Sequence, residues 1–147
     1  MPDTNPRLSE FLAAFRAMEA KLELFADRMT GLQFRATELS EDALRRSLDP
    51  RIHPGPRGTN PTAPAALLTT IAATAARAGS WSHNLMTGAA EVRAFRVTAE
   101  RAQDHQLTEA IAKAAQVERL TLERIPSVSH LREQLNLTAA LFMRSSA

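Results

Sequence analysis

The 147-residue chain contains no cysteine and no tyrosine. Without cysteine the protein has no disulfide framework, no thiolate metal site and no cysteine nucleophile. Glycine occurs only five times, and aromatic residues make up 5% of the chain. This composition disfavours an all-β sandwich or barrel, because strands are rich in aromatic residues and their turns use glycine. These absences favour a helical fold.

Long apolar runs and a strong charge imbalance are also missing. The longest stretch without a charged residue, 58–76, is interrupted by two prolines, an asparagine and several threonines. Its apolar part is shorter than the roughly 20 residues that cross a bilayer, and the N-terminus lacks the pattern of a secretory signal. The formal net charge is +2. We therefore expect one cytoplasmic domain, 1–147, without a membrane partner.

A seven-residue apolar repeat dominates the N-terminal third. Apolar side chains alternate at spacings of three and four, at Leu8, Phe11, Phe15, Met18, Leu22, Phe25, Met29 and Leu32. Such a repeat is typical of a helix that packs along one stripe. Asn5-Pro6 is a typical helix start, and Asp49-Pro50 is a typical end. The pattern predicts helix over 6–48, as one helix or as two nearly collinear ones.

A linker and an alanine-rich helix are expected next. Five prolines and two glycines make 49–64 a crossover loop. The following helix, 64–78, carries Arg77 as its only charge, which predicts burial on all sides. Gly79 is expected to close this helix as its C-cap.

The second half predicts a turn and two further helices. The turn, 80–88, holds the only tryptophan, and a long helix is expected over 89–125, where Pro126 stops it. Ser127 would cap a last helix. The predicted fold class is therefore all-α: a helical bundle built on two long helices, 6–48 and 89–125, with two shorter helices and the Pro-rich loop.

The apolar repeat also suggests a function. With Leu8 as position a, no oppositely charged g–e pair specifies a parallel dimer, so the repeat suits a wider bundle core, within one chain or across a dimer. The two long helices exceed the length that a chain of this size needs when it folds alone. We expect a non-enzymatic protein that acts through protein–protein association, as a homo-oligomer or an assembly subunit, without cofactor or metal. The expected contact residues are Phe11, Phe15, Met18, Leu22, Phe25, Arg51 and Arg57.

DNA binding is the alternative. The sequence LREQLNLT at 131–138 resembles the first helix and turn of a helix-turn-helix, with Asn136 where glycine is usual. The helix-turn-helix-like segment would span 127–144, with DNA contacts from Arg132, Thr138 and Arg144. No basic stripe accompanies this motif, and few donors that could read bases follow it.

A helical metal site is a third hypothesis. Glu100, Asp104, His105 and Glu109 recur at about one helical turn. The Glu-x-x-His order of di-metal carboxylate proteins is absent, however. Local ion pairs of Arg96 with Glu100, and of Arg101 with the other acids, account for the same residues without a metal.

Overall fold

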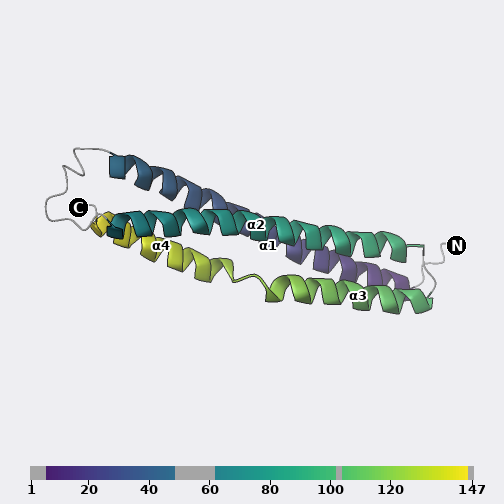
Figure 1. The fold of residues 1–147 in the computed structure, drawn as a ribbon. Helices are drawn as coiled ribbons and strands as arrows, with labels where there is room; N and C mark the ends of the chain where they lie inside the picture. The colour runs from purple at the N-terminus through teal and green to yellow at the C-terminus, as the bar shows by residue number, and fades with distance from the viewer. Residues whose placement is uncertain (1–5, 49–61, 102–103, 146–147) are drawn as a thin grey trace. The chain divides into compact units, whose positions relative to one another are not determined.

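The computed structural model describes residues 6–48, 62–101 and 104–145, and these form four α-helices (Figure 1). The helices are α1 (Pro6–Leu48), α2 (Thr62–Ala99), α3 (Asp104–Glu123) and α4 (Val128–Ser145). No strand occurs in these ranges, which confirms the all-α class. None of these helices is both long and apolar enough to cross a membrane.

The first helix is continuous over the whole predicted range, 6–48. Buried apolar residues recur every seven positions along it, at Phe15, Leu22, Met29, Ala36 and Ala43, and Ala26 and Leu32 are buried as well. Gly31 does not interrupt it, although glycine in a helix interior costs about 1 kcal/mol relative to alanine. The apolar stripe continues on both sides of Gly31, so packing of that stripe holds the helix together.

The boundaries predicted for the second long helix are wrong. This helix spans 62–99, not 89–125, and it runs through the turn expected at 80–88. Buried residues recur every seven positions along it, at Ile71, Ala78, Leu85, Val92 and Ala99. This stripe favours helix throughout and outweighs the isolated turn-forming residues. The helix ends near Glu100 and Arg101, whose backbone amides donate to the carbonyls of Arg96 and Thr98.

Gly79 is not the C-cap that the sequence predicts, because it lies inside α2. An added Cβ at Gly79 would lie 2.7 Å from Nε2 of Gln33 on α1. Gly88, also inside α2, has a similar environment: a Cβ there would lie 2.9 Å from Oγ1 of Thr121 on α3. Gly88 therefore marks a close approach of α2 to α3, whereas Gly79 lies against the end of the flexible Gln33 side chain.

The alanine-rich segment is not buried on all sides, contrary to the prediction. Ile71 is buried, but Ala65 and Ala66 are exposed. Thr69 and Thr70 are exposed too, and their hydroxyls donate to the carbonyls of Ala65 and Ala66 at 2.9 and 3.0 Å. The threonine hydroxyls make this face partly polar, so it is exposed to solvent although it carries few charged residues. Of the predicted linker, 49–61 lies outside the described residues.

Two compact units share the long helices. The first combines residues 6–27 of α1 and 81–99 of α2 with α3. Here α1 and α2 are antiparallel, since the hydroxyl of Ser82 donates to the carbonyl of Ala26 at 3.3 Å whereas Arg93 contacts Glu23 earlier in α1. The core of this unit contains Phe15, Leu22, Leu85, Val92, Leu107 and Ala114.

The second unit combines residues 28–48 of α1 and 62–80 of α2 with α4. Its core contains Met29, Leu32, Ala36, Ile71, Leu131, Leu135 and Phe142. The hydroxyl of Ser127 accepts a hydrogen bond from the amide of His130 at 3.1 Å, which confirms the predicted cap.

Candidate functional site

A cluster of charged side chains lies in the first unit, where α1 packs on α2. Glu19 is 6% exposed, and it lies one helical turn from the buried residues Phe15 and Leu22 of α1. The Nε atom of Arg96 donates to Oε2 of Glu19 at 2.7 Å, and the Nε atom of Arg93 donates to Oε1 at 3.2 Å. Both carboxylate oxygens of Glu19 are thus occupied by guanidinium groups from the neighbouring helix.

The arginines keep this carboxylate ionised. Burial alone would raise the pKa of Glu19, but hydrogen bonds from Arg96 and Arg93, together with their positive charges, outweigh burial and lower it. The hydrogen bond to Glu19 in turn raises the pKa of Arg96. A carboxylate held in this way is a poor proton acceptor, so it is better suited to fixing α1 against α2 than to acid–base chemistry.

Two outer acids complete the charged cluster. Nη2 of Arg93 donates to Glu23 at 2.6 Å, and Nη1 of Arg96 donates to Glu100 at 3.1 Å. The second contact confirms the predicted local pair of Arg96 and Glu100. An open hollow of about 350 Å³ lies beside the cluster, with Arg16 on its rim.

The residues expected to contact a partner lie mainly in the interior of the first unit. Phe15 and Leu22 are both 0% exposed, and Phe11, Met18 and Phe25 are half-buried. A fully buried side chain cannot contact another protein while the unit is closed. The apolar repeat therefore forms the core within one chain. Arg51 and Arg57 lie outside the described residues.

The turn of the predicted helix-turn-helix is absent from α4. This helix continues through Asn136 without a break, because Leu135 and Phe142 are buried on either side of that residue, seven positions apart. The hydroxyl of Thr138 donates to the carbonyl of Gln134, within the helix, at 2.9 Å. The helix-turn-helix interpretation of 127–144 is therefore wrong in its geometry.

The other two residues of that interpretation are at the surface. Arg132 and Arg144 are both exposed on α4. They are twelve positions apart on one continuous helix, without the turn that separates the two helices of a helix-turn-helix.

No group of three or more metal-ligating side chains occurs within the described part of the chain. Of the acids in the third hypothesis, Glu109 pairs with Lys113 at 3.1 Å and Glu100 pairs with Arg96. The side chains of Asp104 and His105 lie outside the description.

Several large apolar residues that the seven-residue repeat does not include are exposed in the second unit. Phe34 and Leu48 on α1 are 65% and 73% exposed, and Leu137 on α4 is 67% exposed. Leu44, Leu141 and Met143 are also exposed in this unit. A signal was available in the sequence, because Phe34 lies two residues after Leu32 and therefore about 200° around the helix from the buried stripe.

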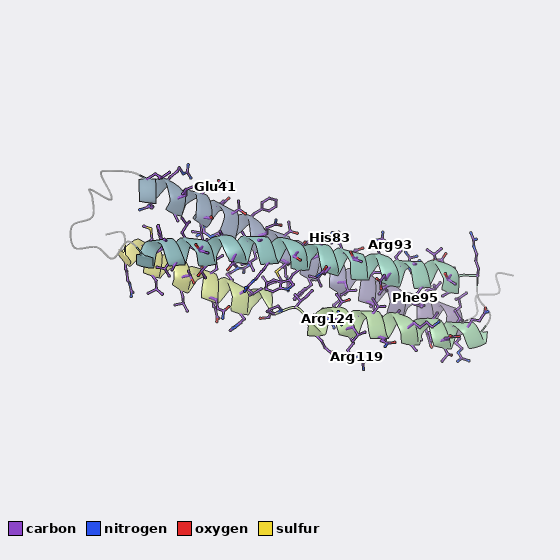
Figure 2. The ribbon with its side chains drawn as sticks, in the orientation of Figure 1. Glu41, His83, Arg93, Phe95, Arg119 and Arg124 are labelled. Atoms are coloured by element: carbon purple, nitrogen blue, oxygen red, sulfur yellow. The ribbon has the colours of Figure 1, made fainter. Side chains whose placement is uncertain are left out.

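A larger hollow of about 560 Å³ lies between α2 and α3 in the first unit. Its lining combines Phe95 and Val97 with the cationic side chains of Arg101 and Lys113. Phe95, which Figure 2 labels, belongs to α2. Lys113 pairs with Glu109 at 3.1 Å. Arg101 has no ion-pair partner among the residues that the structure describes, so the hollow combines an apolar surface with one such cation.

Comparison with known proteins finds no matching family model, no matching curated protein and no matching solved structure.

Proposed function

We propose that this protein is non-enzymatic and acts through protein–protein association, as a homo-oligomer or as a subunit of a larger assembly. The observation that carries this proposal is the exposure of large apolar side chains, the most exposed of which lie on the second unit. Phe34, Leu48 and Leu137 are each more than half exposed, and all three belong to the second unit.

Removing these side chains from water is a driving force for association. Full burial of one leucine or phenylalanine contributes roughly 1.5–3 kcal/mol, and a few large apolar residues commonly dominate binding energy. Isolated exposed apolar residues are ordinary. Here they recur on the same helix faces: Phe34 and Leu48 on α1, and Leu137 and Leu141 one turn apart on α4.

The contact surface of this proposal differs from the one the sequence suggested. The repeat that includes Phe15 and Leu22 forms the core, with coiled-coil-like seven-residue spacing, and the outer faces of α1 and α4 make the contacts. We retain Arg51 and Arg57 as proposed contacts. We also propose a cytoplasmic location.

Photo-crosslinking in the cells that produce the full-length protein tests this function. A benzophenone amino acid replaces Phe34 or Leu137 in separate variants, and Arg119 in a control variant. Arg119 is a matched control because its side chain is 66% exposed and it lies on α3, in the other unit. We expect protein adducts at Phe34 and Leu137 that the control lacks. Adduct yields equal to the control at both positions would refute the function.

A further inference from the structure

The outward face of α1 in the second unit combines apolar and charged residues in a regular order. Phe34, Glu38, Glu41, Arg45 and Leu48 are all exposed, and together they form the α1 outer stripe. At 100° per residue they lie within a sector of about 80°. Figure 2 labels Glu41 at the middle of the stripe. The stripe thus has an apolar residue at each end and two acids and a base between them.

The charges of the stripe are weakly engaged within the chain. Glu38 makes one long contact, 3.8 Å to Nη1 of Arg35, and both side chains are more than half exposed. Arg45 has no ion-pair partner among the residues that the structure describes. By contrast, the neighbouring Arg46 pairs with Asp42 at 3.1 Å. One acid and one base of the stripe are therefore available to a partner.

We propose that the α1 outer stripe packs antiparallel against the same stripe of a second copy of this chain, around a two-fold axis near Glu41. This inference rests on the proposed function and names the partner. In this register Phe34 of one copy lies opposite Leu48 of the other. Glu38 then falls within one residue of Arg45 of the other copy, and the two-fold axis repeats both contacts.

The order of the charges selects the antiparallel arrangement. A parallel pair would place Glu38 against Glu38 and Arg45 against Arg45, and such like-charge contacts are unfavourable. In the antiparallel pair only Glu41 meets its own copy. The stripe is therefore complementary to itself in both charge and apolar contacts, which favours a second copy over an unrelated partner.

The interface is small. The stripe covers 15 residues, so its length is about 21 Å, and one helix pair of this length buries less than the roughly 800 Å² per partner of a standard interface. We therefore expect a reversible dimer whose population rises with protein concentration.

Charge reversal measured by sedimentation velocity tests the pairing. Glu38→Arg and Arg45→Glu, each alone, replace two attractive contacts across the axis with two repulsive ones. Each should raise the dissociation constant roughly tenfold, since exposed ion pairs contribute a few tenths to 1 kcal/mol each. The double variant E38R/R45E should restore the original value. Arg119→Glu, on α3, is the control and should change nothing. Failure of the double variant to restore dimerisation would overturn the inference.

Single cysteines test the orientation, since the natural chain has none. Glu41→Cys places two thiols at the axis and should give a disulfide-linked dimer under mild oxidation. Phe34→Cys is the matched control, because its two copies would lie about 21 Å apart in the antiparallel pair. Equal cross-linking of both variants would indicate a parallel pair and refute the proposal. A monomer at every concentration would also refute it. Photo-crosslinks from Phe34 to a different protein, with that monomer, would leave the proposed function standing.

Discussion

Replacing Gly88 and Gly31 with alanine separates close helix packing from helix propensity. Both glycines lie inside helices, so alanine gains about 1 kcal/mol of helix propensity at either position. A Cβ at Gly31 meets no atom within 4 Å, whereas one at Gly88 would lie 2.9 Å from Oγ1 and 3.2 Å from Cγ2 of Thr121. Thr121 is β-branched and cannot easily rotate away, so overpacking at Gly88 should cost about 1–3 kcal/mol.

The propensity gains cancel when the two variants are compared, so their difference measures the contact between α2 and α3. We expect Gly31→Ala to raise the free energy of unfolding by about 1 kcal/mol, and Gly88→Ala to lie about 1–3 kcal/mol below it. Urea unfolding followed by circular dichroism provides the measurement.

The double variant G88A/T121A provides the control for this contact. Removing Oγ1 and Cγ2 of Thr121 leaves only a contact of ordinary length, 3.5 Å to its Cβ. The pair should therefore be non-additive, with a favourable coupling of about 0.5–3 kcal/mol. Equal stabilisation by Gly31→Ala and Gly88→Ala would show that α2 and α3 are not in close contact at Gly88, and would refute the reasoning.

Three further predictions concern the interior and the helix ends. Phe15→Ala should lower the free energy of unfolding by about 3–5 kcal/mol, and Phe25→Ala should lower it less, because Phe15 is 0% exposed and Phe25 is half-buried. Thermal melting provides the measurement. A decrease in melting temperature that becomes smaller as protein concentration rises would contradict a core within one chain. The lowered pKa of Glu19 stabilises the fold above the ordinary carboxyl value of 4.5, and this stabilisation is lost as the pH falls toward the folded-state pKa. In Glu19→Gln the free energy of unfolding should therefore depend less on pH in the acidic range than it does in the natural protein. The same pH dependence in both proteins would contradict the ion cluster. Ser127→Ala should lower the free energy of unfolding, measured with urea, by about 1 kcal/mol, because the cap on α4 is lost. An unchanged free energy of unfolding would count against the hydrogen bond from the His130 amide to the Ser127 hydroxyl.

Local sequence signals predicted the helices better than their junctions. The repeat from Leu8 onward predicted α1 in full, and Ser127 correctly marked the start of α4. Gly79 predicts a helix end in the sequence, but it lies inside α2, so the predicted junction is misplaced. A glycine inside a helix and a glycine that ends one look alike in sequence when the partner residue is distant.

The candidate site was less accessible from sequence. Glu19 looked like an ordinary charged residue flanking the apolar repeat, and its burial depends on Arg93 and Arg96, 74 and 77 residues away. Phe34 is hard to recognise in the sequence, because the stronger stripe through Leu32 masks a second one on the opposite side of the same helix.

The sequence by itself determined that this chain is helical and where its apolar stripes lie, because helix capping and seven-residue spacing are properties of neighbouring residues. Only the tertiary structure decided that the α1 stripe forms the core of its own chain, that Gly79 and Gly88 are contact points, and that Phe34 faces outward. Each of these depends on helices meeting across long separations in the chain, as the hydrogen bond from Ser82 to Ala26, 56 residues apart, illustrates. Stripe positions follow from local periodicity, whereas the choice of what covers each stripe follows from packing between distant segments.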